Sequence, residues 1–146
     1  MSSVISPLRE QQQQRLAPLL DLPDPQARLA RLVEEARRRA PLAPALRTEA
    51  QRVEGCLVRV WLVAELREGK CFFQCDSDAV SLKAAGGLLG ELYSGHAPEE
   101  ICAAQPGVLE PLQILHQLAE NRQRTLGRIE EMILQFARGQ LDGEGG

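Results

Sequence analysis

Apolar residues recur at helical spacing in three long stretches of the chain, residues 25–40, 79–93 and 121–139. Spacings of three and four residues place such side chains on one face of a helix. Asp24 precedes the first stretch and Asn121 opens the last, and both side chains can cap the free N–H groups at the start of a helix. The pattern therefore predicts three main helices, each with one buried face.

Apolar and polar residues alternate between Leu57 and Leu66, which is the period of a half-buried strand. The next four residues, 67–70 (REGK), are typical of a tight turn, and residues 71–75 then form the returning strand of a hairpin. Residues 48–54 are a further expected strand, just ahead of the glycine and cysteine in the sequence VEGC. The chain is thus expected to contain an antiparallel hairpin with a third strand beside it.

These elements predict an α+β fold, with a small antiparallel sheet of two to three strands packed on one side by several helices. We expect a single domain over residues 16–139. Residues 1–15, rich in Ser and Gln, are expected to be a loose N-terminal tail, and residues 140–146 a loose C-terminal tail. A chain of 146 residues can bury a core of its own without disulfides or metal ions.

Composition and charge argue against several classes of partner. The formal net charge is -3, and the chain has one Trp, one Tyr and three Phe, whereas proteins that bind single-stranded nucleic acid need a positive groove and aromatic platforms. No stretch of about 20 apolar residues would span a membrane, and the first residues lack the pattern of a signal peptide. We therefore expect a cytoplasmic protein that binds neither nucleic acid nor membrane and keeps its four cysteines reduced.

The spacing of Cys and His residues does not favour a metal site or a hydrolase. Cys71 and Cys75 would share one face of a strand with their sulfurs about 13 Å apart, too far for one zinc ion. His96 and His116 stand alone in a loop and a helix and are expected to be structural or solvent-facing. Neither histidine has a spacing to Cys56 that supports nucleophilic catalysis, and no glycine-rich phosphate loop is present. We expect no metal and no cofactor.

Cys56 remains as the candidate for chemistry. It follows Gly55 at a predicted loop-to-strand junction and lies between Glu54 and Arg59. A thiol at the tip of a loop can be reached by a large partner, whereas a thiol inside a strand cannot. The spacing alone slightly favours a second interpretation, in which Cys56 is a small buried hydrophobic residue.

Motifs around this cysteine resemble those of a known family. The sequences VEGC and VRVW, then DSDA at the end of the hairpin, and LAENRQRTL before the last helix follow one another in that order. Together they resemble the SufE-type sulfur acceptors, which are small partners of cysteine desulfurases in iron–sulfur cluster assembly. The resemblance extends from about Leu16 to Arg138 and implies a fold of the SufE/IscU kind.

The resemblance assigns roles to three residues. Cys56 matches the acceptor cysteine, which takes a sulfur atom as a persulfide, and Asp78 and Arg122 match polar positions near it. The resemblance further implies a sulfur carrier rather than an enzyme, without a cofactor of its own. Its partners would be a cysteine desulfurase that uses pyridoxal phosphate and a downstream iron–sulfur scaffold complex. We expect a monomer or a weak homodimer.

Two residues depart from the family pattern. Val58 stands where a serine is common, and Cys75 stands where a glycine often precedes the DSD motif. Cys75 therefore brings an extra thiol near the expected site, which leaves open a pairing with Cys56. The alternative function is that of an iron–sulfur scaffold or zinc-binding protein of the related fold, which would require several converging cysteine ligands.

Overall fold

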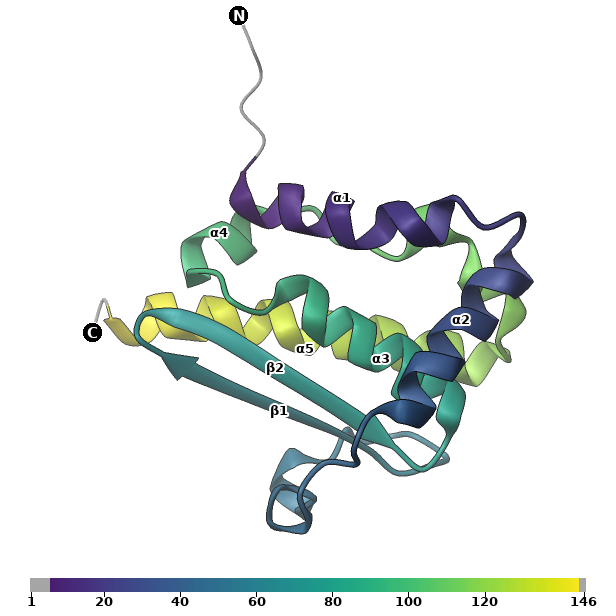
Figure 1. Cartoon of the computed structure of the whole chain (residues 1–146). Helices are drawn as coiled ribbons and strands as arrows, with labels where there is room; N and C mark the ends of the chain where they lie inside the picture. The colour runs from purple at the N-terminus through teal and green to yellow at the C-terminus, as the bar shows by residue number, and fades with distance from the viewer. Residues whose placement is uncertain (1–5, 145–146) are drawn as a thin grey trace, which may run out of the picture.

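The computed structural model describes residues 6–144, which form five α-helices and one two-stranded sheet (Figure 1). The α-helices are α1 (Pro7–Leu20), α2 (Pro25–Arg38), α3 (Val80–Tyr93), α4 (Pro98–Ala103) and α5 (Glu120–Glu144). The strands are β1 (Val60–Arg67) and β2 (Lys70–Ser77), and short 3-10 helices are η1 (Pro44–Leu46), η2 (Glu49–Gln51), η3 (Glu110–Leu112) and η4 (Ile114–Gln117). The α+β prediction is confirmed.

The hairpin forms as the alternating pattern predicts, except that its first strand begins at Val60 rather than at Leu57. β1 and β2 pair antiparallel, with Val60 opposite Ser77 at one end and Arg67 opposite Lys70 at the other. Glu68 and Gly69 make the turn with φ angles of 52° and 79°. Positive φ at both central residues is the turn geometry that matches the twist of a tight hairpin. The returning strand is longer than predicted and reaches Ser77.

The expected third strand over residues 48–54 is wrong. Its first part folds as η2, and its pairing is reduced to an isolated bridge between Arg52 and Trp61. The Val53 N–H also donates to the Val60 carbonyl at 2.8 Å. The 3-10 turn diverts the backbone, so a single bridge forms where a strand would need a continuous ladder. The Val53–Val60 hydrogen bond closes the segment between these two residues into a loop.

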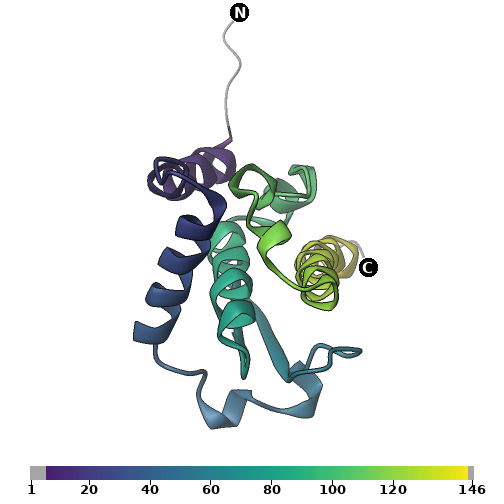
Figure 2. The same cartoon turned by 90° about the vertical axis from the view of Figure 1, so that its right-hand side faces the viewer.

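The helices cover one face of the hairpin. α3 lies between α2 and α5, and α1 lies on the side of α3 away from the hairpin (Figures 1 and 2). Glycines let α3 approach the sheet closely, because a Cβ at Gly90 would lie 3.0 Å from the Phe73 carbonyl oxygen. Phe73 in turn packs edge-on against Phe136 of α5, with ring centroids 5.7 Å apart. β2, α3 and α5 therefore share one core.

The loose N-terminal tail expected over residues 1–15 is corrected from Pro7 onward. α1 is capped by the Ser6 side chain, and Leu8 is only 1% exposed. Gln12 is also buried, and its side-chain amide donates to the Leu92 carbonyl of α3 at 3.1 Å. α1 thus joins the core through its buried leucines, and the Gln12 amide satisfies a carbonyl at the end of another helix. The first five residues of the expected tail lie outside the described part of the chain.

The C-terminal boundary also differs from the prediction. α5 continues through Gly139 to Glu144, so residues 140–144 are helical and the expected tail from residue 140 is wrong for them. Glycine lowers helix stability by about 1 kcal/mol but does not end a helix unless the backbone turns there. Residues 145–146 lie outside the described part. No helix within residues 6–144 is both long enough and apolar enough to cross a membrane.

Candidate functional site around Cys56

Cys56 lies near the tip of the loop that the Val53–Val60 hydrogen bond closes. Gly55 turns the backbone with a φ of 83°, a conformation that favours glycine, and no atom lies within 4 Å of the position of a Cβ there. Leu57 is 85% exposed, whereas the Cys56 side chain is half-buried. The loop therefore holds its thiol partly covered while its outer surface stays open to a partner.

The covered side of the thiol faces α5. The Thr125 hydroxyl lies 3.4 Å from Cys56 Sγ and 3.0 Å from the Asn121 carbonyl oxygen, and its single proton can be donated to either of them. A weaker contact of 3.9 Å joins Cys56 Sγ to the Glu54 carbonyl oxygen. A hydroxyl donor beside the sulfur can stabilise a negative charge that develops on it. Sequence reasoning missed Thr125, because nothing in its spacing ties it to residue 56.

A groove of about 610 Å³ opens between the Cys56 loop and α5. Arg124 and Arg128, both exposed, line its α5 side together with Asn121 and Thr125. Within residues 6–144 neither arginine forms an ion pair with a carboxylate. Glu54 lines the loop side of the groove, so the two arginines give the α5 side a positive charge that is available to an anion or an acidic partner. The family motif points to Arg122 instead, and nothing in the sequence singles out Arg128.

Asp78 and Arg122 lie around the same end of the sheet but form no hydrogen bond to Cys56 within the described residues. The Asp78 carboxylate accepts from Arg59 Nε at 2.7 Å, and the Asp78 N–H donates to the Arg59 carbonyl at 3.2 Å. Arg122 Nη1 donates to Ser81 Oγ at 2.8 Å, which ties the first turn of α5 to the first turn of α3. Both residues therefore hold the surroundings of the loop in place.

The buried acid of the DSD motif is Asp76. Its carboxylate accepts from the Leu42 N–H and from Arg47 Nη2, both at 2.8 Å, and from its neighbour Ser77 N–H at 2.9 Å. Burial alone would raise the pKa of Asp76, but the hydrogen bonds from Arg47 and the two backbone N–H groups outweigh it and lower that pKa. The Arg47 guanidinium also lies 4.6 Å from the centre of the Trp61 ring. Asp76 thus fixes residues 42–47 against the hairpin.

The other three cysteines differ from Cys56 in their surroundings. Burial raises the pKa of Cys71 to about 11 and that of Cys75 to about 12, so both are protonated at neutral pH. Cys102, on α4, is half-buried. Within residues 6–144 no three Cys, His, Asp or Glu side chains are grouped as they would be to hold a metal ion. Cys56 is thus the thiol that combines a loop, a groove and neighbouring cations.

His96 takes the structural role that was expected of it. It is buried, with Nε2 2.7 Å from Gln11 Oε1 and Nδ1 3.1 Å from Glu100 Oε1. Both ring nitrogens therefore bond to side chains of α1 and α4 and help to pack these helices together.

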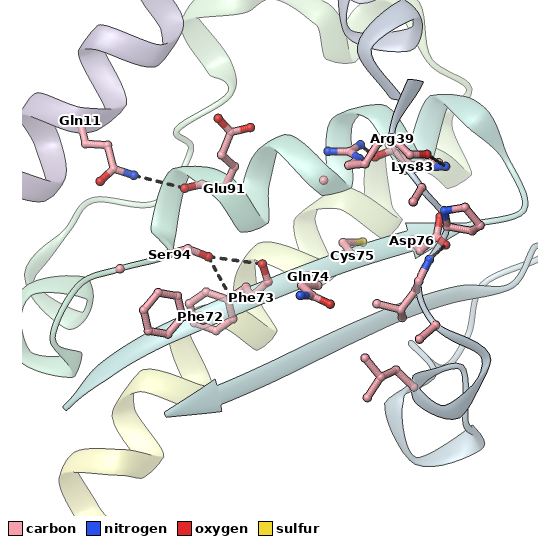
Figure 3. A pocket seen from close by; sticks show the side chains of 17 residues that line it. Gln11, Arg39, Phe72, Phe73, Gln74, Cys75, Asp76, Lys83, Glu91 and Ser94 are labelled. Carbon is pink, nitrogen blue, oxygen red and sulfur yellow. Dashed lines mark hydrogen bonds between the residues drawn. The ribbon is translucent and has the colours of Figure 1, made fainter. Parts of the chain in front are cut away.

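A second cavity, of about 760 Å³, lies between β2, α3 and the segment after α2 (Figure 3). At one end, Arg39 Nη2 donates to the Lys83 carbonyl at 2.9 Å and Lys83 Nζ donates to the Arg39 carbonyl at 3.0 Å. At the other end, Ser94 lies beside Phe73 of β2, and its hydroxyl accepts from the Phe73 N–H at 2.9 Å. Cys75 borders this cavity, whereas Cys56 does not.

A helix-covered hairpin that presents one reachable thiol on a loop defines a small α+β thiol protein. Residues 13–137 match the family described as "SufE: Fe-S metabolism associated domain". The chain therefore belongs to the SufE family, and the predicted family is confirmed.

Similar proteins and a similar solved structure support this assignment. An uncharacterized SufE-like protein of Synechocystis sp. is 30% identical over 84% of this chain and 79% of its own. The chloroplastic SufE-like protein 2 of Arabidopsis thaliana is 31% identical over 71% of this chain, which spans only 41% of that relative. The solution structure of a hypothetical protein from Thermus thermophilus has the same fold, with a TM-score of 0.71 and 25% identity over 90% of this chain and 96% of that one.

Proposed function

We propose that the protein is a sulfur acceptor, which takes a persulfide sulfur from a cysteine desulfurase onto Cys56, stimulates that enzyme and passes the sulfur on for iron–sulfur cluster assembly. Membership of the SufE family and its link to iron–sulfur metabolism support the general role. The observation that supports the specific role is the Cys56 site itself. Its half-buried thiol lies on an open loop, within hydrogen-bond distance of the Thr125 hydroxyl and beside a groove lined by Arg124 and Arg128.

The transfer is a thiol–disulfide exchange. The Cys56 thiolate attacks the outer sulfur of the donor's persulfide, a new S–S bond forms on Cys56, and the donor's S–S bond breaks. The electron pair of that bond leaves with the donor cysteine as its thiolate, so no oxidant or reductant is consumed. The acceptor therefore acts as a carrier, and the pyridoxal phosphate chemistry stays with the desulfurase.

The residues around Cys56 have distinct proposed roles. Thr125 and the two groove arginines stabilise the anionic sulfur, since charge-assisted donors favour an anion. Asp78, through Arg59, and Arg122, through Ser81, position the loop and α5 without touching the sulfur. Leu57, whose side chain is exposed beside the thiol, offers an apolar contact to the desulfurase.

The proposal is tested by incubating the protein with a cysteine desulfurase, pyridoxal phosphate and cysteine, and then measuring the mass gained at each cysteine. We expect one added sulfur atom on Cys56, which Cys56→Ser abolishes together with stimulation of the desulfurase. Cys102→Ser is the matched control, because Cys102 is also half-buried, and it should retain both. Undiminished stimulation by Cys56→Ser would contradict the proposal, and a bound iron or zinc ion lost with Cys71 or Cys75 would support the scaffold alternative.

A further inference from the structure

Two thiols from different parts of the chain approach the same face of α5. Cys56 Sγ lies 3.4 Å from the Thr125 hydroxyl. Cys75 Sγ lies 2.7 Å from the position of a Cβ at Gly86, and that position is 3.5 Å from Ile129 Cδ1. Because Thr125 and Ile129 are four residues apart, they lie on one face of the helix, about 6 Å apart along its axis. Both thiols therefore lie toward the same stretch of α5, Cys56 in contact with it and Cys75 on the far side of Gly86.

The two thiols differ in their access to solvent. Cys75 is buried between β2 and α3 (Figure 3), whereas Cys56 is half-buried beside the open groove. A negative charge on Cys56 is one of the influences that raise the pKa of Cys75, after burial and the charge of Asp76, which agrees with their proximity. A reactant that enters the groove therefore meets Cys56, whereas Cys75 does not line that groove and borders the other cavity.

The loop allows the remaining approach between the two sulfurs. Gly55 has open space around it. The Leu57 side chain on the outer side of the loop is already exposed, so a shift of the loop costs it no buried surface. The Val53–Val60 hydrogen bond holds the base of the loop, so the tip can shift without disturbing the hairpin. Cys75 is fixed in the strand, and the loop supplies the movement.

We propose that Cys56 and Cys75 form a reversible redox pair, in which a hydroperoxide oxidises Cys56 and Cys75 closes an internal disulfide onto it. The pair adds an oxidant-sensitive state to the acceptor cysteine. While the disulfide is present, Cys56 has no free thiol to accept sulfur. The disulfide also protects the Cys56 sulfur from irreversible oxidation.

Both steps balance. The Cys56 thiolate attacks one peroxide oxygen, the O–O bond breaks, and the other oxygen leaves as hydroxide or alkoxide, which gives a sulfenic acid. Cys75 sulfur then attacks the Cys56 sulfur, the S–S bond forms, the S–O bond breaks, and the hydroxyl leaves as water with the Cys75 proton. The two sulfurs lose two electrons, which reduce the peroxide. A dithiol reductant returns those electrons and restores both thiols.

The neighbours of Cys75 favour this pairing over the other cysteines. Cys71 lies four residues along β2, about 13 Å away at the rise of a strand, beside the turn end of the hairpin. The ionisable groups near enough to raise the Cys71 pKa, after burial, include Cys102 and Glu99 of α4. Cys71 and Cys102 therefore belong to the opposite end of the sheet, and Cys75 is the thiol that lies behind the Cys56 loop.

The test uses the full chain and hydrogen peroxide, with no desulfurase present. The protein is oxidised, its remaining thiols are blocked, and the linked peptides are identified by mass spectrometry with fragmentation that separates Cys71 from Cys75. We expect one Cys56–Cys75 link in each monomer, which dithiothreitol reverses. In Cys75→Ala the link is absent and Cys56 proceeds to sulfinic acid, whereas Cys102→Ser keeps the link.

Two results would overturn the redox pair. One is a link from Cys56 to Cys71, to Cys102 or to a second copy in place of Cys75. The other is sulfinic acid forming on Cys56 equally fast in the wild type and in Cys75→Ala. Peptide mapping of the wild type decides the question even if that variant folds poorly. The sulfur acceptance assay is independent, because Cys75→Ala should still accept sulfur on Cys56 when no peroxide is present.

Discussion

Replacing Asp76 by asparagine tests the contact that anchors residues 42–47 to the hairpin. The substitution preserves the shape of the side chain but removes its charge. It weakens the bonds from the Leu42 N–H and from Arg47 Nη2, each 2.8 Å long in the wild type. It also leaves the Arg47 guanidinium without its carboxylate partner. Asp78→Asn is the matched control, because that acid belongs to the same motif but pairs with Arg59 at the surface.

The exposure of the two pairs sets the expected magnitudes. Side-chain exposure is 4% for Asp76 and 29% for Arg47, so the pair is largely removed from water. Breaking a buried pair costs about 3–5 kcal/mol, and the partial exposure of Arg47 places this loss near 3 kcal/mol. In a chain of this size that lowers Tm by about 10 °C. The Asp78–Arg59 pair is 41% and 57% exposed, and its loss should cost less than about 1 kcal/mol.

The pH dependence of the free energy of unfolding provides a second, independent test of this contact. The folded-state pKa of Asp76 is lower than its unfolded-state value, so its contribution is fully present above the unfolded pKa of about 3.9 and is lost as the pH falls through the folded pKa. Urea unfolding followed by fluorescence of Trp61, the single tryptophan, measures the free energy of unfolding from pH 7 downward. The difference between wild type and Asp76→Asn should shrink below about pH 4. An equal loss in both variants at pH 7 would refute the reasoning.

Three further predictions concern the site. Gly86→Ala should destabilise the protein by about 1–3 kcal/mol, since the Cβ of the new alanine would lie 2.7 Å from Cys75 Sγ. In a double-mutant cycle measured by urea unfolding, Cys75→Ala should recover much of that loss. Thr125→Val should slow single-turnover sulfur transfer about fivefold, as expected for one lost hydrogen bond; an unchanged rate would remove Thr125 from the mechanism. Arg128→Glu should weaken desulfurase stimulation most at low salt, whereas Arg138→Glu, an exposed change on the same helix, should not.

The hairpin and α2 were predictable because local sequence determines them. Alternating residues on both sides of a glycine-containing turn specify an antiparallel pair, and Glu68 and Gly69 adopt the two positive φ angles of that turn. Asp24 caps α2 as predicted, accepting from the Ala27 N–H at 2.8 Å. Each of these features depends on residues a few positions apart. Their prediction therefore required no knowledge of the tertiary structure.

The missed features depend on contacts across the chain. Residues 7–15 were expected to belong to a polar tail, but they form most of α1, which packs on the core through the buried Leu8 and through Gln12, whose amide reaches the end of α3, 80 residues away. The difference between the two acids of the DSD motif, Asp76 and Asp78, depends on distant contacts in the same way. Both acids stand in one motif, and only the arrival of Arg47 and the Leu42 N–H shows that Asp76 is the buried one. A local sequence pattern does not reveal partners that are distant in the chain.

The arginines of α5 connect the fold to the proposed function. Cations near a helix N-terminus oppose the helix dipole, and two like charges four residues apart repel each other by some tenths of a kcal/mol. Arg122 is compensated by its bond to Ser81, but Arg124 and Arg128 have no carboxylate partner within the described residues. Local rules are broken mainly where function requires it. An anionic sulfur on Cys56, or an acidic surface of the donor, would supply the missing partner, and the proposed sulfur transfer would therefore turn this unfavourable charge placement into a favourable one.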